Sequence, residues 1–475
     1  MSLRSSLRIA AAVLVVAVVA SCTAGLATGA APSGYPDTLW AQRPVVRLAF
    51  DVADDLRSVT GRESVQFTPD APVCEMVFRA HPNDPTLASS GSSLTLTSAA
   101  VDDQPVVVQT EPAGAPAGAP GTLLQLPLPR CLQAGDSVRA DLAFTVGLGR
   151  DADERIGSSP DTETAWFGSA FPLLSWVRGG GWTRDPAVGM NGETAVSEEF
   201  RLAELTVTAP AAHEVVGVGV ASPSSPGPRP DTTTHRFSAD AVRDVSVSVG
   251  RYDIRERDVN GVRVHLATPS AGTRADPSLW ADQLATAVDT LGRHFGPFPY
   301  ADLWVSIAPG LSDGVEFPGA LQLGDVTKDD LQALVAHEVA HQWFYSLVGD
   351  NQAEHPWLDE SLATVGEALA GGDADYYRNY RVPDDVAGHM GEPMSYWASH
   401  GGFRRYGEGV YNQGASVLLR ARDQVGPDPF DAALRGYIGA NAHRVATPAD
   451  FARAFADHPE VLDALRQAGA LADNE

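Results

Sequence analysis

Lysine is almost absent from this 475-residue sequence, in which Lys328 is the single example. Acidic residues outnumber basic ones so strongly that the formal net charge is −26. That balance argues against a nucleic-acid-binding protein, because phosphate recognition needs clustered Lys and Arg. The apolar fraction of 44% still fits a globular protein rather than a disordered one, and the length favours two or three domains.

Long apolar runs are equally scarce, and the clear one lies near the N-terminus, from Ile9 to Ala20, after Arg4 and Arg8. It is too short for a full membrane span, and the pattern is typical of a secretory signal. The letters VASC, which end at Cys22, resemble the bacterial lipobox, in which the cysteine is lipidated and becomes the new N-terminus. The alternative is an ordinary signal peptide with an incidental Cys22. Either reading predicts export.

The lipobox reading divides this end of the chain into two segments. Residues 1–21 would be a lipoprotein signal peptide, and residues 22–42 would be a tether to the extracytoplasmic face of the cell membrane. The second segment is rich in Ala, Gly, Thr and Pro, a composition typical of a linker.

Cysteine is the third scarce residue, since only Cys74 and Cys131 remain beyond Cys22. In an oxidising compartment, a disulfide between these two is the simplest expectation. Two separate buried thiols are the alternative. Neither cysteine has neighbours that resemble a thiolate metal site or a cysteine nucleophile.

The rest of the chain shows two different sequence patterns. Residues 43–254 show partial alternation of apolar and polar residues, β-branched enrichment and Gly, Pro and Asp turns, which together predict a β domain. Residues 255–475 mix strand and helix patterns and become mostly helical toward the C-terminus. The predicted domain boundary therefore falls after residue 254.

Helix-start signals stand out in the second region. Asp276 and Pro277 form an N-cap and first-turn pair, which predicts an amphipathic helix that ends at Gly296. Thr327 followed by Asp330 resembles a capping box, although Asp replaces the usual Glu or Gln. The helix predicted to start there contains the letters HEVAH.

The HEVAH segment places two histidines four residues apart. On a helix, His337 and His341 lie on one face and can present both imidazoles to one point. Glu338 lies about 100 degrees round from His337, close enough to act on something bound there. Two imidazoles with an adjacent carboxylate suit a zinc ion, with the carboxylate taking a proton from a water that the metal activates.

A catalytic zinc ion needs a third protein ligand, and Glu360 in the letters WLDES is the candidate. It follows His341 with 18 residues between them, so a second helix could bring its carboxylate against the first. Thr364 and Glu367 lie on the same face as Glu360. Either could support a ligand imidazole through a hydrogen bond.

This spacing, followed by Glu in a W-L-x-E context, resembles the gluzincin aminopeptidases related to alanyl aminopeptidase and leukotriene hydrolase. GVEFPG at residues 314–319 is similar to the family's G-x-M-E-N loop, and VYNQGASVLL at 410–419 is similar to its Y-E-K-G segment. The resemblance covers most of the chain. It implies an N-terminal antiparallel β-sandwich or saddle domain, followed by a thermolysin-like mixed α/β and helical catalytic domain.

The same resemblance implies a role for each matching residue. His337, His341 and Glu360 would hold one zinc ion per chain, and Glu338 would be the general base and proton shuttle. Tyr411 would donate a hydrogen bond to the oxyanion of the tetrahedral intermediate.

The resemblance also implies that Glu316 recognises the substrate amine. It would bind the α-ammonium of a peptide substrate and so make the enzyme an aminopeptidase. Family members usually recruit a second acidic or amide residue from the β domain, and Glu163 is the candidate by spacing. The chain departs from the family pattern at Val315 in place of Met, at Phe317 with Pro318 in place of Asn, and at Gln413 in place of Lys.

Three functions therefore compete. The favoured one is an exported, lipid-anchored zinc aminopeptidase. The altered loop around Glu316, and the mere 115 residues that follow Glu360, motivate a zinc endopeptidase as the second. The third is a surface lipoprotein that keeps the fold for binding without catalysis.

Overall fold

The β-rich part of the chain folds into sheets whose strands alternate exposed and buried residues, as β2 (Ser58–Phe67) does along its length.

The computed structural model describes residue 35 and residues 40–190 and 197–472, so the predicted signal peptide and Cys22 lie outside the described residues. Residues 31–475 form one compact unit that contains all of the described ones. Across those described ranges, no helix combines the length and the apolar character that a membrane crossing needs.

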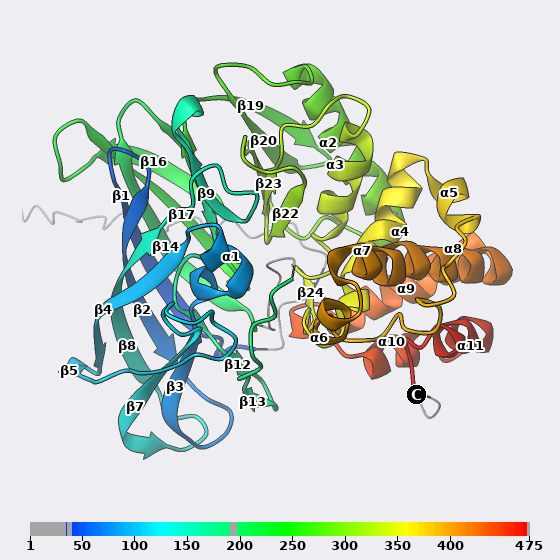
Figure 1. Ribbon diagram of the computed structural model, residues 1–475, viewed down its shortest axis with the longest axis horizontal. Helices are drawn as coiled ribbons and strands as arrows, with labels where there is room; N and C mark the ends of the chain where they lie inside the picture. The colour runs from blue at the N-terminus through cyan, green and yellow to red at the C-terminus, as the bar shows by residue number, and fades with distance from the viewer. Residues whose placement is uncertain (1–34, 36–39, 191–196, 473–475) are drawn as a thin grey trace, which may run out of the picture. The chain divides into compact units, whose positions relative to one another are not determined.

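The largest sheet in the described part of the chain has eight strands (Figure 1). Within it, β1 (Val45–Val52) and β14 (Phe200–Pro210) run parallel, whereas β1 and β2 are antiparallel. In spatial order the strands are β16 (Val220–Pro226), β17 (Thr232–Val242), β14 (Phe200–Pro210), β1 (Val45–Val52), β2, β8 (Val138–Gly147), β4 (Ser93–Val101) and β5 (Gln104–Pro105).

Smaller sheets share a hydrophobic core with the large one. Phe50 of β1, for example, meets Phe167 of β10 (Thr164–Gly168) edge to face, with ring centroids 5.4 Å apart. The sheet-rich N-terminal part that the sequence predicted is therefore confirmed. The other elements of this region are β15 (Glu214–Val216), β18 (Ser246–Gly250), β10 (Thr164–Gly168) and β9 (Ile156–Ser159) in one sheet, β11 (Leu173–Leu174), β3 (Val73–Arg79), β7 (Leu123–Leu132) and β6 (Gln109–Glu111) in another, the hairpin of β12 (Trp176–Val177) and β13 (Gly181–Trp182), and the short helices η1 (His81–Asn83), α1 (Pro85–Ser89) and η2 (Pro160–Thr162).

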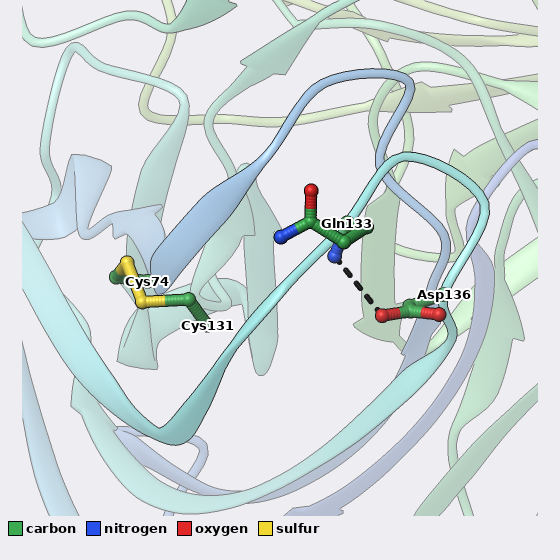
Figure 2. Close-up of a disulfide and its surroundings, with 4 residues drawn as sticks. All are labelled: Cys74, Cys131, Gln133 and Asp136. Atoms are coloured by element: carbon green, nitrogen blue, oxygen red, sulfur yellow. Dashed lines mark hydrogen bonds between the residues drawn. A yellow bond between two sulfur atoms is a disulfide. The ribbon is translucent and has the colours of Figure 1, made fainter.

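A disulfide joins Cys74 of β3 to Cys131 of β7, with Cα atoms 4.1 Å apart (Figure 2). The two strands are antiparallel neighbours, so the disulfide cross-links adjacent strands of one sheet. Close by, the backbone N–H of Gln133 donates to Asp136 Oδ2 at 3.0 Å in the turn after β7. Because 57 positions separate the two cysteines, the cross-link removes considerable freedom from the unfolded chain.

The second region starts with a mixed five-stranded sheet, and β22 lies at one edge of it. Its first strand begins at Tyr252, so the predicted boundary after residue 254 falls inside that strand and stays a prediction. In spatial order the strands are β19 (Tyr252–Val259), β20 (Val262–Pro269), β21 (Asp302–Ile307), β23 (Ala320–Leu323) and β22 (Gly314–Phe317).

Helices dominate the C-terminal half of the second region, and Figure 1 shows them gathered beside this sheet, in yellow to red for the later ones. They share a core with the sheet that is distinct from the β-rich core. The elements are α2 (Pro277–Phe295), α3 (Leu331–Ala340), η3 (Pro356–Leu358), α4 (Glu360–Gly371), α5 (Ala374–Arg378), α6 (Met394–Ser399), α7 (Gly402–Tyr406), the π-helical turn η4 (Gly407–Asn412), α8 (Gln413–Val425), α9 (Pro427–Asn441), α10 (Pro448–Ala454) and α11 (Pro459–Gln467), with the short strands β24 (Val348–Gly349) and β25 (Arg444–Val445).

The two predicted helix starts fare differently. At α2, the side chain of Asp276 accepts from the backbone N–H of Ser278, as an N-cap does, and Gly296 ends the helix as expected. At α3, the helix begins at Leu331, three residues later than an N-cap at Thr327 predicts. Thr327 donates its hydroxyl to Asp330 Oδ2 at 2.8 Å, and this local turn precedes the helix instead of capping it.

Candidate active site

The two histidines of the HEVAH segment and Glu360 converge between α3 and α4. Glu360 Oε2 lies 3.1 Å from His337 Nε2 and 3.5 Å from His341 Nε2. Helix α3 ends at Ala340, but His341 keeps helical dihedral angles, so the four-residue spacing still places both rings on one face. Their ring centroids are 4.8 Å apart. All three side chains are buried.

Each imidazole is oriented by a second carboxylate on its other nitrogen. Nδ1 of His341 lies 2.6 Å from Asp359 Oδ1, and Nδ1 of His337 lies 3.2 Å from Glu367 Oε2. With a metal ion bound beside Glu360, Nδ1 would be the donor in both rings and both Nε2 atoms would be free to ligate the metal. Of the two supports that the sequence suggested, Glu367 fills the role. Thr364 instead donates to the backbone carbonyl of Glu360, one turn back on its own helix.

The separations of Glu360 Oε2 from the two histidine nitrogens suit a tetrahedral zinc ion. Bonds of about 2.0–2.1 Å at tetrahedral angles place ligand atoms roughly 3.3 Å apart. The two nitrogen–oxygen distances, 3.1 and 3.5 Å, lie on either side of that value. The donor set of two imidazoles and one carboxylate is the one that catalytic zinc sites use while leaving a position open. These residues therefore fit the zinc ion that the sequence predicted.

The charges around the site favour a cation. Burial tends to lower the pKa of His337, yet the Glu360 and Glu367 carboxylates outweigh it and raise that pKa to about 10. Burial likewise tends to raise the pKa of Glu360, but hydrogen bonds from both histidines hold it well below its usual range. Burial raises the pKa of Asp359 to about 6, against the opposing effect of His341. The cluster stabilises positive charge beside Glu360, and a zinc ion would supply such a charge.

Glu338 is buried beside this group, with 4% of its surface exposed. Its Oε2 has no hydrogen-bond partner among the described residues. Burial raises its pKa to about 8, with the two histidines acting in the opposite direction. Gly314 of β22 approaches so closely that a Cβ there would collide with the Glu338 carboxyl. Backbone therefore packs closely against this carboxyl group.

Glu316 lies on the edge strand β22, on the His341 side of the group. It is buried, and one of its oxygens lies within 4.8 Å of ligand atoms of both Glu338 and His341. Gln352 Nε2 donates to Glu316 Oε1 at 3.2 Å and to Asp359 Oδ2 at 2.8 Å, so it links the two acids. Phe317 is fully buried in the β-rich core, so this departure from the family pattern lies outside the cleft lining.

Tyr411 lies against His337, in the π-helical turn η4. Its ring stacks on His337 with centroids 5.6 Å apart and planes 8° from parallel. A π-helical turn widens the backbone and shifts the subsequent side chains, and such turns often occur at functional sites. Tyr411 also lines the cleft that contains the histidines.

These side chains lie along one cleft of about 990 Å³. Glu163, the residue that the sequence suggested from the β domain, does not line it. That suggestion is wrong, because Glu163 has a left-handed backbone and forms an exposed ion pair with Arg251. The β-rich region instead contributes neighbouring residues that sequence reasoning missed, Asp153, Glu154 and Arg155.

Comparisons with known proteins agree with this geometry. Residues 323–467 match the Peptidase family M1 domain. Over 126 residues the chain is 28% identical to an aminopeptidase N from Haemonchus contortus, covering 24% of this chain and 13% of that protein's length. The chain thus spans only about an eighth of that relative.

Solved structures resemble the fold over nearly the whole chain. A two-domain M1 zinc metallopeptidase variant bound to L-tryptophan superposes with a TM-score of 0.66 at 17% identity, covering 90% of this chain and 94% of that one. A variant from Deinococcus radiodurans, bound to a Tyr-Ser-Ala substrate, gives a TM-score of 0.65 at 18% identity, with coverage of 90% and 94%. At these identities the likeness shows the shared fold.

The sheet-rich and helical regions together have the fold of the two-domain M1 zinc metallopeptidases to which the chain is similar. The chain carries a Peptidase family M1 domain, and the resemblance to gluzincin aminopeptidases seen in its sequence is confirmed.

Proposed function

We propose that this protein is a zinc-dependent aminopeptidase. One observation carries the proposal: both Nε2 atoms of the buried histidine pair face Glu360, while Glu338 Oε2 lies unpartnered among the described residues of the same cleft. A zinc ion bound by His337, His341 and Glu360 would supply a Lewis acid that polarises a peptide carbonyl and lowers the pKa of a water molecule.

The chain's own residues then divide the remaining work. Glu338 accepts a proton from the attacking water and passes it to the departing amine, which suits a buried carboxylate with a raised pKa. Tyr411 donates a hydrogen bond to the oxyanion that develops on the carbonyl. The stacking of its ring on His337 keeps the phenol beside the reaction centre.

Glu316 supports removal of single residues from the N-terminus. Its buried carboxylate lies beside His341 and Glu338, where it would bind the α-ammonium of a peptide. Glu154, from the β-rich region, lines the same cleft and is a second candidate for this charge. A carboxylate fixed at one end of a cleft measures distance from the free amine, and the bond cleaved is then the first one.

The distinguishing experiment compares a peptide with its N-acetylated form, each with and without a chelator. We expect rapid release of the first residue from the free peptide, little cleavage of the acetylated peptide, and loss of both activities on chelation. Equal cleavage of the acetylated form would refute the aminopeptidase proposal and support the endopeptidase instead. The endopeptidase is kept as a second candidate because Glu316 already accepts a hydrogen bond from Gln352 and the cleft is large.

We also propose that the protein is exported and lipid-anchored through Cys22. The VASC sequence after the apolar run supports this, as does the disulfide between Cys74 and Cys131, because disulfides persist in oxidising compartments. In the segment expected to be the tether, Tyr35 donates its hydroxyl to the Phe295 carbonyl at 3.3 Å. A Cys22→Ser variant is expected to move from the membrane fraction to the soluble fraction. An unchanged membrane location would exclude the lipid anchor.

A further inference from the structure

Gln352 is a buried side chain that donates to two acids of the site at once. It lies in the loop between β24 and η3, and 3% of its surface is exposed. Its Nε2 donates to Glu316 Oε1 at 3.2 Å and to Asp359 Oδ2 at 2.8 Å. An amide nitrogen carries two hydrogens, so each carboxylate receives one of them. Because Glu316 lines the cleft and Gln352 does not, the amide supports the cleft wall from inside the protein.

The two acids serve different parts of the site. Asp359 places its other oxygen, Oδ1, 2.6 Å from Nδ1 of His341, one of the residues that would hold zinc. Glu316 is the carboxylate proposed above to bind the α-ammonium of a peptide, and one of its oxygens lies within 4.8 Å of a His341 nitrogen. Gln352 is therefore hydrogen-bonded both to a group that orients a metal ligand and to the group that would recognise the substrate.

Glu316 depends on this amide more than Asp359 does. Within the described residues, Gln352 donates the one hydrogen bond that the Glu316 carboxylate accepts, whereas Asp359 also has His341. A buried carboxylate without donors is costly, so a fixed donor holds its side chain in place. Because this donor is a neutral amide, the negative charge of Glu316 stays available. A Lys or Arg here would instead neutralise the acid and compete with the substrate's ammonium group.

We propose that Gln352 is a positioning residue that couples recognition of the substrate amine to the zinc site, by holding Glu316 and Asp359 at a fixed separation. The part that concerns Glu316 rests on the aminopeptidase function proposed above. The part that concerns Asp359 follows from the contact between Asp359 and His341. Loss of the amide would free the Glu316 side chain and leave Asp359 Oδ2 without this donor, so both parts of the site would change together.

The test replaces Gln352 with Met, which keeps an unbranched side chain of similar size and removes both donors. Competition with a chromophoric chelator gives the zinc affinity, which should fall by about tenfold because His341 loses part of its support. The second quantity is the ratio of kcat/KM for Ala-Gly-Gly to kcat/KM for propionyl-Gly-Gly, which lacks only the amine, measured in the zinc-loaded protein. This ratio should fall by about tenfold, mainly through a higher KM for Ala-Gly-Gly, since the amine is bound both before and during the reaction.

Matched variants separate positioning from a general structural effect. Gln352→Leu repeats the test with a second apolar side chain. Gln424→Met on α8 changes an exposed glutamine outside the cleft lining and should leave both quantities at their wild-type values. In a Glu316→Gln background, Gln352→Met should change the ratio by less than about threefold, because residues that act through one contact are not additive. In an Asp359→Asn background, it should change the zinc affinity by less than about threefold for the same reason.

The outcomes distinguish the coupling from the function on which it rests. Full effects in either double variant would overturn the inference, because Gln352 would then act through other groups. A change in only one of the two quantities in Gln352→Met would overturn it as well. A wild type that cleaves both peptides equally well refutes the aminopeptidase function, and the coupling falls with it. A high wild-type ratio that survives in Gln352→Met overturns the coupling alone and leaves the aminopeptidase function standing.

Discussion

Asp359 Oδ1 lies 2.6 Å from Nδ1 of His341, and both side chains are buried almost completely. This pair fixes which nitrogen of the ring carries the proton and turns Nε2 toward Glu360. Glu367 does the same for His337 at 3.2 Å. The zinc site is therefore supported by a second layer of carboxylates.

Replacing Asp359 with Asn should weaken zinc binding by about 10- to 100-fold, the usual cost of losing such an outer partner. Competition with a chromophoric chelator measures the affinity directly. Asp375→Asn, a change at a largely exposed acid on α5, is the control and should bind zinc as the wild type does. An Asp359→Asn protein with wild-type affinity would show that this carboxylate does not support the metal.

Gly314 should tolerate no side chain, because a Cβ there would collide with the Glu338 carboxyl. We expect Gly314→Ala to lower kcat by more than about tenfold, since small misplacement of a catalytic group is costly, while zinc content stays at one per chain. Gly292→Ala on α2 is a matched control, because a Cβ there meets no atom within 4 Å. That control should keep full activity and gain roughly 0.5–1 kcal/mol of stability. Wild-type turnover in Gly314→Ala would contradict the importance of Glu338's position.

Tyr411→Phe removes a hydroxyl and keeps the ring that stacks on His337. If the phenol stabilises the oxyanion, kcat should fall by about 10²–10³ with little change in KM, because the interaction exists only in the transition state. Steady-state kinetics on an alanine amide would measure both. A rise in KM with unchanged kcat would assign Tyr411 to ground-state binding instead.

Asp431 provides a test of stability against pH. Although burial tends to raise its pKa, hydrogen bonds from Arg422 and His294 lower it to about 2, from an ordinary value of 3.8. Since the folded pKa is depressed, the stabilisation is complete above pH 3.8 and is lost as the pH falls through about 2. Asp431→Asn should lower the free energy of unfolding by about 2 kcal/mol at pH 7, and the difference should shrink between about pH 4 and pH 2.

Urea unfolding at several pH values checks this expectation. The exposed Asp457→Asn serves as the control and should leave the free energy of unfolding unchanged within about 0.5 kcal/mol. A pH-independent difference for Asp431→Asn would show that charge is not the cause.

Site residues close together in the sequence were easier to predict than residues far apart in it. The pair His337 and His341 is local, so helical spacing alone predicts that both face one point. Glu360 followed from the need for a third zinc ligand and from its spacing after His341, whereas Tyr411 came from a motif resembling a known family. Asp359 directly precedes Glu360, and its acidic side chain next to a ligand was a usable signal that was overlooked.

The missed residues belong to contacts that only the tertiary fold creates. Glu154 reaches the cleft from the β-rich region, far from the histidines in sequence, and spacing pointed wrongly to Glu163. The start of α3 was misplaced because Thr327 and Asp330 hydrogen-bond to each other in a turn ahead of the helix.

The most direct measurement is turnover by Glu338→Gln, with the zinc content determined on the same sample. The amide keeps the shape of the side chain but cannot accept a proton. We expect one zinc per chain and a fall of about 10²–10⁴ in kcat on an alanine amide, the usual contribution of a general base. Wild-type turnover by a fully zinc-loaded Glu338→Gln protein would contradict the assignment of Glu338 as the general base.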